Sequence, residues 1–561
     1  MLSVWRMPLS AQNLDQIGKG EAFSLSGGVS TTQIVYAAQG LEQRRDPYSY
    51  FINGNLALSI YGLSMPFSFS YSNQNAAFQQ PFNQYGLSPT YKGWTAHLGY
   101  RSMTFSPYTL NGHIFLGTGL EYQSTGAWKF SAMYGRLQKE VVYDSTQLDA
   151  QAAFRRMGYG LKTAYQKDRS LVEFVIFGAE DQMGTMNYLP TDNSLMPMQN
   201  LVIGLNASQT LGRVAIRGEY ANSALVRDTR AKDFRPSVSN LQDYLTPIYQ
   251  RKVSSSYYDA LKLNATYQGA WFQVGLGYER IDPEYQTLGA YYFANDLENM
   301  KLNTAFRLFQ QKLNVSVNTG LQKNNLKGDK SQEMERWVGA ANLSYAASAK
   351  LNLSGSYSNF QTFTRIRSVF ETLNQTTPYD NLDTLNYTQL AQSANLNANY
   401  MLAASKARSS SLSCMLSYQQ SDDKQGETTL ATGTQFYNGN ASYTHTLNER
   451  NMGVTTSFNY NLQQGLGMNT SAWGPSFSIN KALWEKKVKT AVTISYNEAR
   501  DQGIRLSGIT NLRFSGGYTY LKKHNFSLSL ITLNRQSRAG EGLSLSTFNE
   551  FTGTLTYNYS F

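Results

Sequence analysis

The chain has 561 residues, a mean hydropathy of −0.42 and a net charge of +11, with few charged residues (16%) and many aromatic ones (13%). No stretch approaches the ~20 consecutive apolar residues of a membrane-spanning helix, which excludes a helical membrane protein. The lone Cys414 excludes a disulfide framework and a cysteine-based metal site. The basic residues are scattered, without a run of five or more, so the net charge does not indicate a nucleic-acid-binding protein.

The N-terminal stretch "MLSVWRMPLSAQNLDQ" combines a short apolar piece with "LSAQ", where small residues precede a cleavage point after Ala11. This pattern is typical of the end of a secretory signal, so we interpret residues 1–21 as a signal-peptide remnant with an N-terminal extension. Arg6 and Pro8 interrupt the apolar piece, and an unstructured terminus is the second interpretation. Residues 22–561 are predicted to form a single domain.

Alternation of apolar and polar residues is the dominant pattern of that domain. In "LNVSVNTGL" (313–321) and "MGVTTSFNYNL" (452–462), apolar residues share one side of an extended chain and polar residues share the other. A period of two residues is typical of strands whose two faces meet different solvents. Strands of a closed barrel in lipid have this pattern, and they never produce a long hydrophobic window.

The connections between these segments alternate between very short and long. Tight turns are predicted near residues 125, 168, 211, 268, 310, 348, 406, 448, 484 and 523. Long polar connections are predicted at 139–153, 183–197, 224–253, 283–295, 363–387, 421–434 and 537–547. We therefore predict an all-β fold: a closed antiparallel transmembrane β-barrel of about 24 strands (roughly 22 to 26), with short periplasmic turns and long extracellular loops.

Residues 74–112 break this rhythm, because Pro81, Pro89 and Pro107 punctuate a segment with one strand-like piece, 93–103. Long ordered loops are usually functional, and we predict that this segment folds inward as a plug or constriction. The predicted lining of the constriction is Trp94, His97, Arg101 and Tyr108. The alternative, which we weigh nearly equally, is that 93–103 and its neighbour are wall strands, giving about 26 strands with ordinary loops.

Part of this segment also carries a family resemblance. Residues 85–122, "YGLSPTYKGWTAHLGYRSMTFSPYTLNGHIFLGTGLEY", resemble a stretch of large outer-membrane barrels of the Bacteroidota, most of which have no assigned function. The resemblance implies lineage and an outer-membrane location in a Gram-negative bacterium, and it brings no catalytic residues. A strand followed by a proline-containing inward segment is also similar to the arrangement in anion-selective porins.

The chain ends on "FTGTLTYNYSF" (551–561), in which odd positions are apolar, aromatic or glycine and even positions are small and polar. This pattern predicts a closing wall strand with Phe551, Leu555, Tyr557, Tyr559 and Phe561 toward lipid. A terminal aromatic residue on such a strand resembles the signal by which the barrel-assembly machinery recognises its clients. The resemblance implies that Tyr557, Tyr559 and Phe561 form that signal.

Residues that carry enzyme chemistry are sparse. The four histidines, His97, His113, His445 and His524, lack metal-ligand spacing, and no nucleophile elbow, phosphate loop or dinucleotide fingerprint occurs in a fitting context. His445 in "ASYTHTLNE" is a candidate for a Ser–His pair on the lipid-facing rim, but an interface histidine is the favoured interpretation. We expect no enzymatic activity, no metal and no cofactor.

The basic residues of the longest regular loop outnumber Asp228, Asp233 and Asp243; they are Arg227, Arg230, Lys232, Arg235, Arg251 and Lys252. They suit lipopolysaccharide phosphates or anionic solutes, although a plain hydrated loop is the favoured interpretation.

The predicted function is a channel for passive or weakly selective transport of solutes across the outer membrane, because a barrel this wide is not filled by its wall side chains. The alternative is a barrel component or scaffold of a multiprotein export or assembly complex. The predicted partners are outer-membrane lipid and lipopolysaccharide, the barrel-assembly machinery during biogenesis and, for the alternative, proteins of a complex.

Overall fold

The structure is a computed structural model that describes residues 23–61, 63–73, 84–123, 126–141, 152–185, 195–234, 241–245, 248–328, 335–359, 364–365, 386–387, 392–421, 424–425, 428–429, 434–465, 467–537 and 547–561. The signal-peptide interpretation of residues 1–21 lies outside the described residues and stays a prediction. Among the described residues, no helix is long and apolar enough to cross a membrane.

The first part of the main sheet contains β1 (Phe23–Gln39), β2 (Tyr48–Ile60), β3 (Leu63–Ser72), β4 (Gln84–Leu87), β5 (Thr90–Tyr91), β6 (Trp94–Thr104), β7 (Asn111–Gln123), β8 (Trp128–Gln138), β9 (Arg155–Lys167), β10 (Ser170–Gln182), β11 (Gln199–Leu211), β12 (Val214–Val226), β13 (Ser255–Gln268) and β14 (Phe272–Ile281). The second part contains β15 (Leu297–Leu308), β16 (Leu313–Lys323), β17 (Glu335–Ala346), β18 (Leu351–Ser358), β21 (Gln392–Ala404), β22 (Arg408–Ser421), β25 (Thr434–Leu447), β26 (Met452–Gly465), β27 (Met468–Leu483), β28 (Val488–Asp501), β29 (Ile504–Tyr520), β30 (His524–Ser537) and β31 (Phe548–Ser560). The loops carry the short 3₁₀ helices η2 (Met183–Thr185) and η3 (Leu241–Tyr244) and the strand pairs β19 (Thr364–Arg365) with β20 (Asn386–Tyr387) and β23 (Lys424–Gln425) with β24 (Thr428–Thr429).

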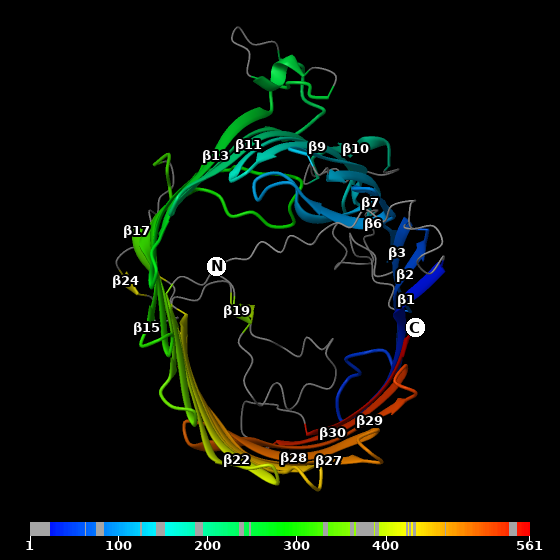
Figure 1. Ribbon diagram of the computed structural model, residues 1–561, viewed down its shortest axis with the longest axis vertical. Coiled ribbons are helices and arrows are strands. Elements are labelled where there is room, and N and C mark those ends of the chain that lie inside the picture. Colours follow the sequence, from blue (N-terminus) through cyan, green and yellow to red (C-terminus); the bar gives the residue numbers. More distant parts are fainter. Residues whose placement is uncertain are drawn as a thin grey trace.

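The main sheet closes on itself, because β31 pairs antiparallel with β1 from Gly28↔Ser560 to Gln39↔Asn549. Figure 1 shows the resulting ring, with the C-terminus beside β1. The sheet has 27 strand segments, but β4 and β5 are two pieces of one strand, so 26 strands cross the wall. The prediction of a closed antiparallel barrel is confirmed, and the strand number lies at the upper end of the predicted range.

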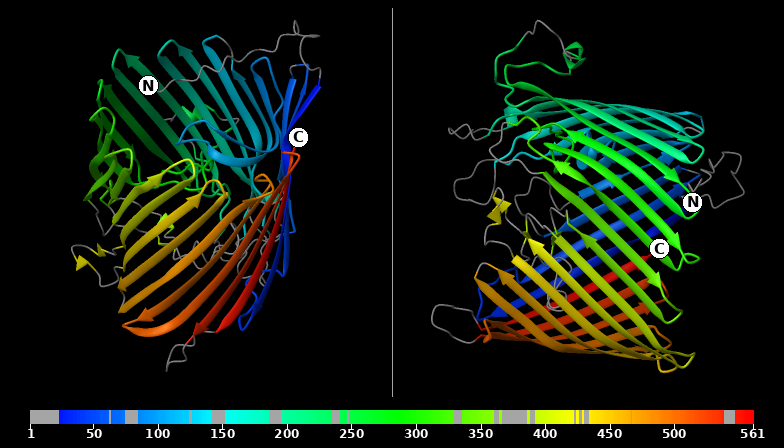
Figure 2. Two further views of the ribbon diagram at one scale, coloured as in Figure 1. Left: turned by 60° about the horizontal axis from the view of Figure 1, so that its bottom comes forward. Right: turned by 90° about the vertical axis from the view of Figure 1, so that its left-hand side faces the viewer.

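The two ends of the barrel differ in the length of their connections, as predicted. Figure 2 shows the short turns at one end, which we call the turn end, and the longer connections at the other, the loop end. The ten predicted tight turns all lie at the turn end, where β31 also finishes. Two connections at the loop end, 466–467 and 502–503, are as short as the turns, so the alternation is not strict.

The two faces of the wall also follow the alternation. On β31, Phe551 and Leu555 are exposed on one face, whereas Thr552 is fully buried on the other. Across the closure Tyr559 pairs with Val29, and Thr556 pairs with Thr32. The apolar face is the exterior, or lipid face, and the polar face lines the lumen.

Residues 84–104 lie in the wall, which corrects the plug interpretation for this part of the segment 74–112. The physical reason is backbone pairing: β4 pairs with β3 and β6, and β6 pairs with β7 from Trp94↔Tyr122 to Thr104↔Asn111. Residues 74–83 lie outside the described residues, and residues 105–110 enter the lumen. The alternative interpretation, about 26 strands, is therefore the one that agrees with the structure.

The closure predicts a cross-link between the first and last strands. In a Cys414→Ser background, Thr32→Cys with Thr556→Cys should form a disulfide, because these residues are direct partners with their hydroxyl oxygens 3.2 Å apart. Faster migration of the unfolded, non-reduced chain in a denaturing gel measures the bond. Thr32→Cys with Ser478→Cys, on strands that do not pair, is the control, and equal cross-linking of both pairs contradicts the closure.

Candidate functional site

Two connections at the loop end turn into the lumen and pack against each other. They are residues 105–110, between β6 and β7, and residues 282–296, between β14 and β15, and we call them together the inner ledge. Tyr108, Leu110, Tyr285 and Leu288 are at most 2% exposed, which is unusual for loops. Figure 1 shows green chain entering the ring beneath β11 and β13.

Hydrogen bonds join the two halves of the inner ledge. The Tyr285 hydroxyl donates to the Tyr108 carbonyl and the Thr287 hydroxyl donates to the Thr109 carbonyl, both at 2.7 Å. The Asn111 amide donates to the Gly289 carbonyl at 2.9 Å. Because buried backbone groups must be paired, these bonds allow both loops to lie inside the barrel.

The wall strands hold the inner ledge with polar side chains of the lumen face. Asn200 on β11 accepts from the Leu288 amide at 3.1 Å, and Ser223 on β12 donates to the Gln286 carbonyl at 2.7 Å. The Tyr108 hydroxyl donates to Glu279 Oε1 on β14 at 2.8 Å. The inner ledge is thus attached to at least three strands of the wall.

Beneath the inner ledge, the side chains on the lumen face of the wall are apolar instead of polar. Phe105, Leu110 and Tyr285 form one buried cluster with Val175 and Phe177 of β10. Glycines provide the room, because a Cβ on Gly160 would lie 2.5 Å from the Phe105 ring and one on Gly289 would lie 2.7 Å from the Phe177 ring.

Charged groups of the wall accompany the inner ledge. The Glu279 carboxylate that receives the Tyr108 hydroxyl lies 3.7 Å from Lys262 Nζ and 3.4 Å from Lys301 Nζ. Burial, reinforced by the Glu279 carboxylate, raises the pKa of Tyr108 far above its usual range. Burial also raises the pKa of Tyr285. Both phenols therefore stay protonated, and both remain hydrogen-bond donors at any physiological pH.

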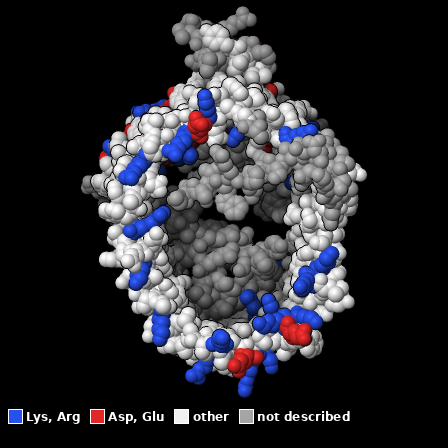
Figure 3. Space-filling model, in the orientation of Figure 1, with Lys and Arg blue, Asp and Glu red and all other residues white. Residues whose placement is uncertain are grey.

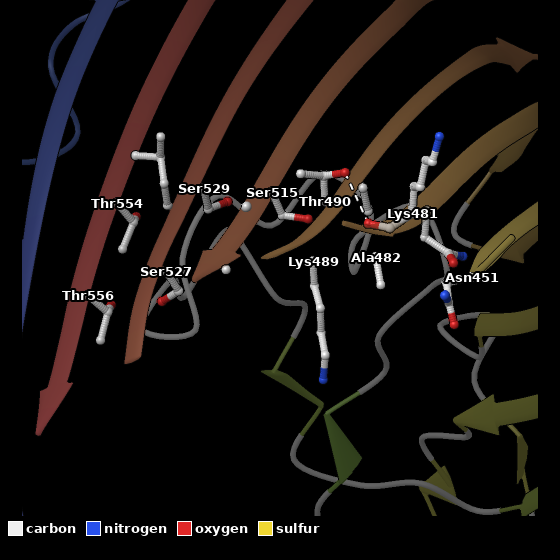
Figure 4. A pocket seen from close by; sticks show the side chains of 15 residues that line it. Asn451, Lys481, Ala482, Lys489, Thr490, Ser515, Ser527, Ser529, Thr554 and Thr556 are labelled. Carbon is white, nitrogen blue, oxygen red and sulfur yellow. Dashed lines mark hydrogen bonds between the residues drawn. The ribbon is translucent and has the colours of Figure 1, made fainter. Parts of the chain in front are cut away.

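The opposite wall is lined by hydroxyl groups paired across strands. Examples are Ser413 with Ser442 and Ser457 with Ser476, both at 2.6 Å. A pocket of about 480 Å³ lies on this wall. Ser, Thr, Gly and Ala residues of β27–β31 make up most of its lining, which also includes Asn451, Asn480, Lys481 and Lys489 (Figure 4). A lining of short hydroxyl side chains offers water and polar solutes many exchangeable hydrogen bonds and few charges.

The structure does not bring the four predicted constriction residues together. Trp94 is 46% exposed on the lipid face, where its ring lies 4.4 Å from that of Tyr122. His97 lies on the lumen face, with Nδ1 3.0 Å from Ser88 Oγ and Nε2 3.3 Å from Glu121.

Arg101 and Tyr108, the other two, lie apart from each other. Arg101 donates to Ser68 Oγ at 2.6 Å beside the short strand β4, whereas Tyr108 belongs to the inner ledge. A role for His97, Arg101 and Tyr108 in solute passage stays a prediction.

The predicted assembly-signal residues lie where the last strand meets the first. Tyr557 and Tyr559 share the lipid face; Tyr557 stacks on Phe526 at 4.7 Å, and its hydroxyl lies 2.8 Å from His524 Nδ1. The Phe561 amide donates to the Gly27 carbonyl at 3.0 Å. Recognition of these residues by an assembly machinery stays a prediction.

The described residues of the basic loop, 227–234, 241–245 and 248–254, lie outside the ring, where Figure 1 shows the extension that carries η3. Tyr249 joins Leu201 and Ala224 in a small apolar cluster there. Much of its positive charge is compensated by four ion pairs. They are Arg230–Asp228 (2.8 Å), Arg251–Asp243 (3.0 Å), Lys252–Asp233 (2.5 Å) and Arg227–Glu284 (2.7 Å).

The Tyr258 hydroxyl, supported by Arg227, holds the pKa of Glu284 below its usual value. Arg235 lies outside the described residues, and contact with lipopolysaccharide stays a prediction.

His445 has the serine neighbour that the lipid-face hypothesis required. Its Nδ1 lies 2.7 Å from the hydroxyl of Ser410 on the adjacent strand. Ser410 is buried (8% exposed), however, and within the described chain no carboxylate bonds to the imidazole. The pair therefore resembles a structural contact more than a nucleophile with its base.

In the described part of the chain, no group of three or more His, Cys, Asp or Glu residues is placed to hold a metal ion.

The sequence interpretation missed the loop 282–296 as a partner of residues 105–110. One signal was present: "FVIFGA" (174–179) and "LVIG" (201–204) are continuous apolar runs that interrupt the alternation. Such runs are typical of strands that are buried on both faces. Here the second buried face is the one that the inner ledge covers.

Comparisons with known proteins find similar architecture only. No protein-family model and no curated protein matches the sequence. Among solved structures, the P pilus usher PapC translocation pore is 10% identical, over 96% of this chain and 99% of that one, with a TM-score of 0.39. OccAB2 of Acinetobacter baumannii is 10% identical (70% and 97% covered, TM-score 0.30), and an anion-selective porin from Comamonas acidovorans is 9% identical (55% and 93%, TM-score 0.29). Likenesses of this size establish neither a family nor a function, and the Bacteroidota lineage stays a prediction.

The inner ledge should loosen when its central hydrogen bond is removed. Tyr285→Phe leaves the buried Tyr108 carbonyl without its donor, which should cost about 1–3 kcal/mol of local stability. Hydrogen exchange of residues 105–110 and 282–296 should accelerate while the wall strands remain protected. Tyr244→Phe, at a site that is 75% exposed, is the control. Unchanged exchange in both loops contradicts the assignment of the bond.

Proposed function

We propose that this chain is an outer-membrane channel of a Gram-negative envelope that passes small hydrophilic solutes by passive or weakly selective diffusion. The observation that carries the proposal is a closed wall of 26 strands with an apolar exterior and a hydroxyl-lined interior. In barrels of about 16 strands or more, wall side chains no longer fill the interior. A polar lining of that size favours a water-filled passage.

The difference between the two ends of the barrel supports the outer-membrane location. Short turns and the final residue of β31 lie at one end and the longer connections lie at the other, and the strand number is even. These features are typical of single-chain barrels inserted from the periplasm. In this orientation the inner ledge lies toward the external mouth of the channel.

The inner ledge is the proposed constriction. Tyr108, with Glu279, Lys262 and Lys301, places both signs of charge on one arc, while cross-strand pairs of neutral hydroxyl groups line part of the opposite arc. A passage that combines paired charges of both signs with hydroxyl groups favours polar solutes in general and discriminates weakly between anions and cations.

Conductance across a planar bilayer tests the proposal. The wild-type protein should conduct, and Tyr108→Ala with Tyr285→Ala should raise the single-channel conductance, because the ledge loses two large side chains, one of the three hydrogen bonds that join its halves and its bond to Glu279. Tyr244→Ala, outside the ring, should not change it. A folded wild-type protein that never conducts rules out the channel. An unchanged conductance after proteolysis has shown the ledge to be released rules out the constriction.

A further inference from the structure

The turn end of the barrel carries most of the net charge of the chain. Its connections contain eleven basic and three acidic residues, an excess of eight positive charges out of the total of +11. The basic residues are Lys92, Arg169, Arg213, Lys312, Lys350, Lys406, Arg450, Lys486, Lys487, Lys522 and Lys523. Figure 3 looks onto this end and shows Lys and Arg around the rim with few acidic residues between them.

Large apolar side chains alternate with these charges. In the turns or next to them, Tyr61, Leu211, Trp271, Phe309, Trp484 and Leu521 are 54–73% exposed. Trp484 precedes Glu485, Lys486 and Lys487 in one turn, where Lys487 Nζ lies 3.7 Å from the exposed Glu485 carboxylate. Leu521 precedes Lys522 and Lys523 in another turn. A rim that exposes both aromatic and basic side chains suits the interface of an anionic bilayer, where rings enter the headgroup layer and ammonium groups meet phosphates.

Four of these apolar residues occupy left-handed backbone positions of their turns. Tyr61, Phe309, Trp484 and Leu521 have φ values of 44°, 53°, 49° and 49°, in the left-handed region. Glycine and asparagine adopt this region easily and are the usual residues of tight hairpins, whereas bulky side chains are strained in it. Gln310, Glu485, Lys486 and Lys522 share the left-handed conformation, so the tight turns impose it on whatever residue stands there. The choice of bulky apolar residues at four such positions, all exposed at one end, points to a use for their side chains.

We propose that the turn end is a binding ring for the headgroups of anionic phospholipids, with Trp484 and Leu521 inserted into the leaflet and the adjacent lysines on the phosphates. A soluble acidic protein would explain the charge, but it would not require solvent-exposed tryptophan and leucine at strained positions on turns that lie beside the lipid face. The inference rests on the membrane-spanning barrel and is independent of whether the lumen conducts.

Nanodiscs of equal parts phosphatidylcholine and phosphatidylglycerol test the lipid preference. Native mass spectrometry of the full chain should show phosphatidylglycerol enriched among the retained lipids. Lys486→Gln, Lys487→Gln, Lys522→Gln and Lys523→Gln together should lower the enrichment by about fivefold or more, since a single lysine near an anionic surface contributes roughly that factor. The matched control replaces four lysines of the loop end by Gln: Lys232, Lys252, Lys323 and Lys327.

Equal retention of both lipids by the wild-type protein overturns the proposal and leaves an acidic protein as the partner of the ring. Equal loss in the control overturns the assignment to the turn end. Because conductance is not part of this experiment, a barrel that does not conduct can still show the lipid preference, so failure of the channel and failure of the ring are distinguishable.

A second variant separates insertion into lipid from structural support. Trp484→Asn with Leu521→Asn relieves strain, so the variant should unfold at the same or a higher temperature than the wild type in detergent micelles. In vesicles of the same lipid mixture it should unfold at a lower temperature than the wild type. Lower unfolding temperatures in both media would assign the two side chains to barrel stability and overturn their role in the ring.

Discussion

The need to pair every backbone group within lipid is the constraint from which the rest of this structure follows. An open sheet would leave one row of N–H and C=O groups unpaired on β1 and another on β31, at a cost of several kcal/mol per group in hydrocarbon. Pairing of β31 with β1 removes both rows. It also fixes which face of each strand meets lipid, because a shift of one residue would turn every side chain to the other face. The lumen is a consequence of this closure.

Connections that enter the lumen carry their own unpaired backbone groups with them. The inner ledge satisfies those groups with side chains, for example Thr287 on the Thr109 carbonyl and Asn200 on the Leu288 amide. The wall changes to match: Val175 and Phe177 replace polar lumen residues, and Gly160 leaves room for Phe105. Loop and wall thus form one packed unit, which explains how a connection can narrow a channel without being displaced by water.

The extent to which the sequence predicted this structure depends on the range of the interactions. Alternation is local, so the strands, the tight turns and the orientation of Tyr557 and Tyr559 could be inferred from short stretches. The same rule, applied strictly to β6, would have separated Trp94 from His97 and Arg101, because odd and even residues face opposite sides. The contact between Tyr285 and Tyr108 spans 177 residues, and a single sequence contains no pattern that pairs two loops so far apart. The break between β4 and β5 at Ser88 and Pro89 is local, but it made a wall strand look like a loop.

The turn end shows how a membrane can outweigh local turn chemistry. A left-handed residue with a side chain costs roughly 1–2 kcal/mol relative to a favoured conformation, so four such residues together cost about as much as the whole net stability of a small domain. Asn or Gly at Tyr61, Phe309, Trp484 and Leu521 would remove that cost and leave every backbone bond of the sheet in place. An exposed ring in water offers no compensation, whereas a ring or leucine moved from water into a bilayer gains about 1.5–3 kcal/mol. The two magnitudes are comparable, so coverage by lipid would offset the strain at these turns, as the proposed headgroup ring requires.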